Sequence, residues 1–312
     1  MASQAYPLTI GLPQTNYRNF AEASLLMEAG HFFWQALGEA IGRPVAQLRA
    51  ATGEPVYAVI YFVEETFPED RVLATFGLDD RLQFDVSLRA MGTLAVEARV
   101  AFDREDDLAT ASPHPVIRFG SVFATPQPET RQLKLAAPAN AEVSRLAPLP
   151  PEENPARLTR EAQATGRLGL IDEAAWPVLD LNGPTIVSYT IDPDRDTNAT
   201  GLVYFANFVR MLETGERAAI PQPTRFGDRR SEAALRDRHV LQRRIAYYTN
   251  AGASDRIAIS VTRFGVPNRA DLLGLRYRLN REGEAQPLCL SEAILRFGPG
   301  ARSARATEPH ET

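Results

Sequence analysis

Apolar side chains in the first forty residues recur at the spacing of an α-helix. The pattern runs from about Phe20 to Ile41, and the remaining faces of this segment also carry bulky apolar residues such as Trp34. Asn19 and Glu22 have the spacing of a capping box at its start. A helix without a polar face must be enclosed by protein, so the pattern predicts an enclosed helix over 20–41.

Runs with the composition of β-strands follow this helix. Their connections are short, as at residues 68–71, which favours antiparallel hairpins over parallel crossovers. The strands are expected at 56–67, 72–84, 87–102 and 115–125.

The second part of the chain repeats this order. A strand expected at 185–191 leads through a polar turn to a helix that carries Leu202, Phe205, Val209 and Glu216 on one line. Further strands are expected at 239–249, 256–264, 272–280 and 287–297. The pattern therefore predicts an internal duplication of one helix and four or five antiparallel strands. A curling sheet that wraps each helix satisfies this pattern, which places the chain in the α+β class.

Composition changes between the two repeats. Residues 126–180 are rich in proline and are expected to link an N-terminal unit, 1–125, to a C-terminal unit, 181–297. Leucines spaced through the first part of this segment are expected to anchor it to the surface: Leu133, Leu135, Leu146 and Leu149. The polar residues 298–312 are expected to be disordered.

Composition narrows the class of protein. The chain has 312 residues, of which 44% are hydrophobic, and its net charge of −5 gives no reason to expect nucleic acid. No apolar run approaches the ~20 residues of a membrane helix, so we expect a soluble, cytoplasmic protein. The single cysteine, Cys289, cannot form an internal disulfide, and the scattered histidines predict no metal site. Phosphate-loop, dinucleotide and nucleophile-elbow motifs are missing from the sequence.

One segment carries a chemical signature. Residues 196–208 read Asp-Thr-Asn-Ala-Thr-Gly-Leu-Val-Tyr-Phe-Ala-Asn-Phe and resemble the motif of hot-dog-fold acyl-thioester enzymes, in which a polar turn with glycine precedes the central helix. Unpaired backbone N–H groups at a helix start can stabilise a thioester oxyanion. The resemblance implies such a substrate-binding role for Thr200, Gly201 and Leu202.

Asn198 departs from that motif. In the hydrolytic hot-dog enzymes an aspartate at this position acts as nucleophile or base, and an asparagine amide can only form hydrogen bonds. Simple hydrolysis is therefore disfavoured. Asparagine also fills turns and helix caps well, so a purely structural role remains open.

Across residues 10–297 the chain resembles the double hot-dog bifunctional acyltransferase/decarboxylases of polyketide biosynthesis, of the leinamycin-pathway type. The matching segments are residues 11–14, 25–28 with Trp34, 53–58, 121–123 and 202–206. The resemblance implies a catalytic role for Tyr57, either as the acyl carrier or as a hydrogen-bond donor to an enolate. The alternative is an aromatic side chain that packs against the helix, and Tyr61 would share the strand face of Tyr57.

An arginine-rich stretch near the C-terminal repeat is the last candidate. Arg243 and Arg244 could bind the phosphates of coenzyme A or dock an acidic carrier protein. Arg225, Arg229 and Arg230 belong to the same stretch, and the acidic residues between them favour an internally paired surface instead.

Together these features predict two tandem hot-dog subdomains, each an antiparallel sheet wrapped around a central helix, packed as a pseudo-dimer. Tyr57 of one half and Asn198 of the other would form one composite site. The resemblance implies that the protein decarboxylates a malonyl-type thioester, such as methylmalonyl-coenzyme A, and transfers the acyl group to an acyl-carrier protein, without metal or organic cofactor. The alternatives are a dehydratase, an atypical thioesterase and a non-catalytic acyl-thioester or carrier-protein binding module. A homodimer is left open.

Overall fold

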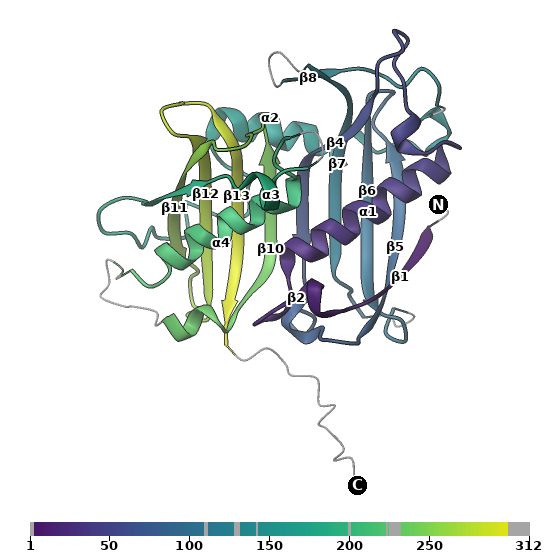
Figure 1. The fold of residues 1–312 in the computed structure, drawn as a ribbon. Coiled ribbons are helices and arrows are strands. Elements are labelled where there is room, and N and C mark those ends of the chain that lie inside the picture. Colours follow the sequence, from purple (N-terminus) through teal and green to yellow (C-terminus); the bar gives the residue numbers. More distant parts are fainter. Residues whose placement is uncertain are drawn as a thin grey trace.

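In the computed structural model one long antiparallel sheet carries two helices on the same face (Figure 1). The structure describes residues 3–108, 112–127, 132–141, 143–198, 201–222, 224 and 232–298. The predicted disordered tail lies outside these residues except for Gly298. No helix in the described ranges is long and apolar enough to span a membrane.

The sheet has the same strand order on both sides of its centre. Its order is β1-β5-β6-β7-β4-β10-β13-β12-β11-β9, with β8 paired to β7. The N-terminal strands are β1 (Gln4–Thr9), β4 (Tyr57–Thr66), β5 (Arg81–Ala90), β6 (Ala95–Arg104), β7 (Val116–Gln127) and β8 (Gln132–Leu135). The C-terminal strands are β9 (Thr185–Thr190), β10 (Arg238–Tyr247), β11 (Arg256–Gly265), β12 (Leu272–Arg281) and β13 (Pro287–Phe297).

The two halves join at the antiparallel pair β4–β10, in which Phe62 lies opposite Ala246 and Thr66 opposite Gln242. Each of these strands carries a bulge against its other neighbour, between Ile60 and Phe62 in β4 and between Val240 and Gln242 in β10. The mirrored order and the matching bulges confirm the predicted duplication and pseudo-dimer.

The first central helix, α1 (Glu22–Ala40), confirms the helix predicted over 20–41. Its ends lie within two residues of the predicted ones. Its apolar residues are buried on nearly every side, Leu25 and Phe33 among them. The expected capping box is wrong: the residue before the helix is Ala21, and no side chain caps it. Asn19 instead lies in a two-residue strand with a left-handed φ of 73°, and its side-chain amide donates to the carbonyl of Ala74.

The second central helix, α4 (Phe208–Ala219), begins later than the sequence predicts. Leu202 and Val203 are extended because they pair with the loop after β10, where the Val203 N–H donates to the carbonyl of Ala251 over 2.9 Å. A 3₁₀ turn, Phe205–Asn207, then leads into the helix. Apolar periodicity could not separate this extended segment from the helix because Val203 also faces the core.

The strands of the C-terminal half match the prediction within two residues, whereas two strands of the N-terminal half do not. Residues 72–80 form a 3₁₀ turn and a loop, and β5 begins only at Arg81. Val72 and Phe76 are fully buried in that loop, which made it resemble a strand. The turn between β5 and β6 contains Gly92, whose φ of 72° favours glycine.

The proline-rich segment 126–180 contains β8 and a helix, α2 (Pro155–Thr165). Ala162 and Leu168 pack with Ala246 and Leu290 in a small cluster separate from the main core. Since Ile245 belongs to the main core, α2 covers the sheet face opposite α1 and α4. Of the expected leucine anchors, Leu149 is buried and Leu146 packs on the core, whereas Leu133 and Leu135 are 37% and 56% exposed.

Candidate functional site

A small hairpin precedes each central helix. In the first half Thr15–Asn16 pairs with Asn19–Phe20, and in the second half Thr197 pairs with Val203. The hydrogen bond that closes each hairpin is also repeated: the Ala21 N–H donates to Gln14 and the Tyr204 N–H to Asp196, over 2.9 and 3.0 Å. A left-handed φ occurs in each turn, at Asn19 (73°) and at Gly201 (75°). Asn16 and Asn198 therefore occupy equivalent positions of the duplication.

Asn198 is exposed at the tip of the second hairpin. Its backbone N–H donates to the carbonyl of Leu202, and its own carbonyl accepts from the Gly201 N–H, both over 2.9 Å. The Gly201 amide, one of the three expected oxyanion donors, is thus engaged in the turn. Thr200 lies outside the described residues. The backbone of this hairpin positions Asn198 firmly in front of the 3₁₀ turn that starts α4.

Tyr57 is the first residue of β4 and is 40% exposed. Ala58 and Ile60 face the main core, so Tyr57 and Tyr61 alternate to the opposite face, as expected for their spacing. Tyr57 therefore does not pack against α1. Tyr61 is half-buried, and its ring would clash with any side chain larger than glycine at position 120. Burial, and then the negative charge of Glu97, raise the pKa of Tyr61 above its ordinary value.

Topology brings Tyr57 and Asn198 to the same end of the central strand pair. Because β4 and β10 are antiparallel, β4 starts where β10 ends. The segment after β10, at Ala251 and Gly252, pairs with Val203 and Leu202 of the Asn198 hairpin. The two candidate catalytic residues thus come from different halves and lie toward the same end of the junction, with the Tyr57 side chain on the sheet face opposite the central helices.

Asp196 is the acid closest in sequence to Asn198, and its side chain is enclosed. It is fully buried, and its carboxylate accepts from the Tyr189 hydroxyl and the Asp192 N–H over 2.9 Å and from Arg195 over 3.1 Å. A carboxylate held in this way orders the hairpin and has no access to a substrate water. The sequence signature did not indicate this structural role.

Behind the hairpins, a buried cluster of charges joins the two halves. Arg243 of β10 is fully buried and contacts Glu22 of α1 over 2.5 Å and Glu216 of α4 over 2.9 Å. Glu216 also accepts from Arg238 over 2.6 Å and from the Tyr277 hydroxyl over 2.8 Å. Arg243 thus has no route to a phosphate in solvent, contrary to its expected role in binding one.

Arg244 lies on the opposite face of β10 and is 25% exposed. It donates to Glu64 over 2.6 Å and to the carbonyl of Leu168 over 2.8 Å. Its contacts fit the internally paired alternative. Arg225, Arg229 and Arg230 lie outside the described residues.

The pKa values of two carboxylates in the cluster are shifted in opposite directions. Burial would raise the pKa of Glu216, but the charges of Arg238 and Arg243 outweigh it and lower the pKa to about 2. Burial, and then the negative charge of Glu22, raise the pKa of Glu65 well above its ordinary value. Glu65 is 3.9 Å from Arg243, too far for a hydrogen bond. A proton on Glu65 would leave Glu22 and Glu216 to balance the charges of Arg238 and Arg243.

We expect Glu65→Gln to change how stability depends on pH. A raised pKa means that the folded state holds the proton more tightly, so the contribution of Glu65 to wild-type stability falls as pH rises above about 4.5. Removing the titration should flatten this decline by up to about 1.4 kcal/mol per pH unit. Urea unfolding of both proteins between pH 5 and 8 measures the effect. Identical pH slopes would show that Glu65 is ionised in the folded protein.

Comparison with known proteins identifies the fold. The chain is similar in structure to a protein named as an oleoyl thioesterase from Lactobacillus plantarum, with a TM-score of 0.65 at 11% identity over 96% of this chain and 97% of the other. The double hot-dog fold is therefore established. An acyl-ACP thioesterase from Bacteroides thetaiotaomicron gives 0.58 at 10% identity over 94% and 97%. The 12:0-ACP thioesterase from Umbellularia californica gives 0.58 at 13% over 95% and 94%. No protein-family model and no curated protein sequence matches.

A repeated dipeptide in the sequence marks the duplicated hairpin. Thr-Asn stands at residues 15–16 and again at 197–198, shortly before each helix. This repeated pair makes Asn16 the counterpart of Asn198 in the other half of the pseudo-dimer. A double hot-dog thus has two related ends of its central strand pair, one beside Asn198 and one beside Asn16.

Proposed function

We propose that the protein acts on acyl thioesters, decarboxylating a malonyl-type coenzyme A thioester and transferring the acyl group to the phosphopantetheine thiol of an acyl-carrier protein. The observation that carries this proposal is the exposed Asn198 hairpin before α4, at the position where hot-dog hydrolases use a carboxylate. Supporting it, acyl-ACP thioesterases of similar fold align with nearly the whole chain. The resemblance to double hot-dog acyltransferase/decarboxylases supports the choice of reaction.

The proposed reaction balances without a redox step. Cleavage of the carbon–carbon bond releases carbon dioxide and leaves its electron pair in a thioester enolate, which then takes a proton at carbon. The carrier thiol next attacks the thioester carbonyl, and coenzyme A leaves as the thiol. The amide of Asn198 would donate a hydrogen bond to the enolate oxygen or orient the carboxylate that is lost.

A thioesterase is the second candidate, because the similar solved structures carry that description. Hydrolysis requires a base that activates water. Asn198 cannot titrate, and the carboxylate of Asp196 is buried among its own partners. These two residues favour decarboxylation, since the departing carboxylate supplies the electron pair without a base.

Tyr57 supplies a prediction that separates its two possible roles. We expect Tyr57→Phe to slow decarboxylation by about 10²- to 10⁴-fold if the hydroxyl donates to the enolate or protonates it. If the phenol oxygen carries the acyl group, transfer should vanish, and wild-type protein without carrier should gain an acyl mass on Tyr57. Rate measurements and peptide mass spectrometry distinguish these results.

Tyr61→Phe is the matched control, since this tyrosine shares the strand face of Tyr57 but lies half-buried beside Gly120. It should retain normal turnover. Normal rates of decarboxylation and transfer in Tyr57→Phe would show that the Tyr57 hydroxyl has no role in catalysis.

The reaction class is tested by offering methylmalonyl-, malonyl- and propionyl-coenzyme A separately. We expect carbon dioxide from one or both of the first two and negligible hydrolysis of the third. Rapid release of free coenzyme A from propionyl-coenzyme A would favour the thioesterase.

A further inference from the structure

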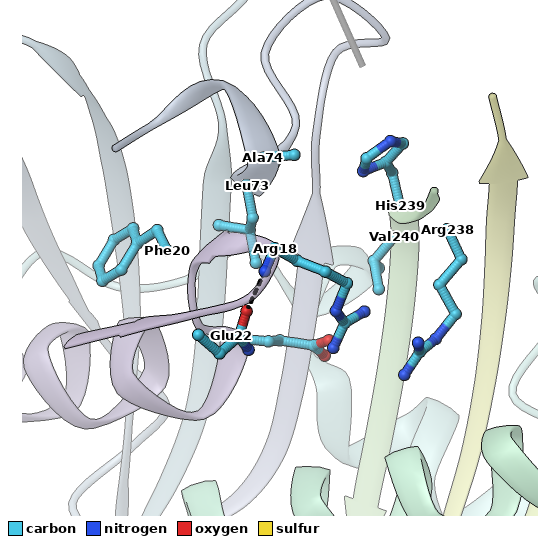
Figure 2. A pocket seen from close by; sticks show the side chains of 9 residues that line it. Arg18, Phe20, Glu22, Leu73, Ala74, Arg238, His239 and Val240 are labelled. Atoms are coloured by element: carbon cyan, nitrogen blue, oxygen red, sulfur yellow. Dashed lines mark hydrogen bonds between the residues drawn. The ribbon is translucent and has the colours of Figure 1, made fainter. Parts of the chain in front are cut away.

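An open pocket lies at the second related end of the central strand pair (Figure 2). The hairpin before α1 contributes Asn16 and Arg18, and the start of β10 contributes Arg238 and His239. Glu22 of α1 also lines it. Asn16 is the counterpart of Asn198, so this pocket is the pseudo-symmetric partner of the proposed catalytic site.

Two guanidinium N–H groups in this pocket have no hydrogen-bond partner among the described residues. They are Nη2 of Arg238 and Nε of Arg18, and both atoms are buried. Arg238 is 99% enclosed, with 1% of its surface exposed. Its other nitrogens are engaged, Nε by Glu216 over 2.6 Å and Nη1 by the carbonyl of Leu235 over 2.7 Å. A buried N–H without a partner is costly, so these donors point to a ligand acceptor.

The neighbouring acids already have partners. Glu213 pairs with Arg18, Glu216 with Arg238 and Arg243, and Glu22 with Arg243. In Figure 2 the side chains of Arg18, Arg238 and Glu22 point toward the same region between the α1 hairpin and β10. These acids are held by their ion pairs, so an acceptor that enters the pocket from outside would satisfy the two remaining N–H groups.

His239 contributes a neutral side chain to the pocket. Burial lowers the pKa of His239. This effect is larger than the opposite effect of the hydrogen bond to the carbonyl of Gly298, which spans 3.1 Å. The imidazole thus donates Nε2–H to Gly298 at neutral pH. The cations that face the pocket are the two arginines, which suit the planar oxygens of a carboxylate or phosphate.

We propose that this pocket is a second, oxyanion-binding site, which holds a carboxylate or a phosphate between Arg18 and Arg238. The proposal does not depend on the reaction assigned above, because its ligand is bound at the opposite end of the strand pair from Asn198. It assigns to the hairpin before α1 a binding role in place of an inactive copy of the Asn198 hairpin.

Calorimetric titration with malonate and with inorganic phosphate, at constant ionic strength, tests this site. We expect saturable binding of at least one anion below about 10 mM. Arg18→Gln should weaken it about tenfold or more, since a charge-assisted hydrogen bond is lost. Arg71→Gln is the control, because Arg71 is similarly enclosed and paired with an acid, Asp103, but does not line the pocket. It should bind like wild type.

A second measurement guards against misfolding of Arg18→Gln. The bound anion should raise the melting temperature of wild type and of Arg71→Gln, and by much less that of Arg18→Gln. Stronger binding of malonate identifies the ligand as a carboxylate, and stronger binding of phosphate identifies it as a phosphate. The absence of saturable binding by either anion, or equal binding by a folded Arg18→Gln protein, would overturn the proposal.

Discussion

Replacing Arg243 by leucine should lower the free energy of unfolding by about 3–5 kcal/mol. The substitution removes the cation shared by Glu22 and Glu216, and a buried charge left without its partner is costly to this extent. Because the cluster draws residues from α1, α4 and β10, the loss should weaken the junction of the two halves. Equilibrium unfolding in urea, followed by circular dichroism, measures the change.

Arg244→Leu is the matched control for this prediction. Arg244 is the next residue of β10 and also pairs with a glutamate, but it is 25% exposed on the opposite face. Ion pairs open to water contribute little, so this variant should lose about 1 kcal/mol or less. Equal losses in the two variants would mean that the buried cluster contributes no more than a surface pair.

Replacing Asn198 by alanine should reduce turnover by about 10²-fold. This is the usual cost of removing one donor that stabilises an oxyanion. The hairpin is closed by backbone hydrogen bonds at Asn198, Gly201 and Val203, so its shape should survive the loss of the amide. Steady-state rates with methylmalonyl-coenzyme A give the effect, and the melting temperature reports on folding.

Asn140→Ala provides the control for Asn198. Asn140 also orders a loop, since its side chain bonds the backbone of Arg49 and Gln47. The Asn140→Ala variant should have a lower melting temperature and unchanged turnover. Undiminished turnover in Asn198→Ala would show that Asn198 has only a structural role in the turn.

The duplication and both central helices could be predicted because burial leaves a clear periodicity in sequence. The strands of the C-terminal half were placed within two residues, since β10 to β13 are separated by short polar turns. Prediction was wrong where loops carry core residues: Val72 and Phe76 are buried outside any strand, and Val203 is buried before α4 begins. Burial alone does not distinguish such loops from regular elements.

The candidate site was only partly accessible to sequence reasoning. Tyr57 and Asn198 came from motif resemblance, and the pairing of β4 with β10 explains why they approach one end of the junction. The partners of Arg243 could not be predicted, because Glu22 and Glu216 are more than twenty residues away along the chain. Such contacts arise only when the two halves pack together.

The most direct test of the proposed function is to incubate the protein with methylmalonyl-coenzyme A and a phosphopantetheinylated acyl-carrier protein, and to weigh all products by mass spectrometry. We predict equal amounts of carbon dioxide, coenzyme A and propionyl-carrier protein. Free methylmalonate or propionate with an unacylated carrier would identify a thioesterase and contradict the account, and so would tight binding of the thioester without any turnover.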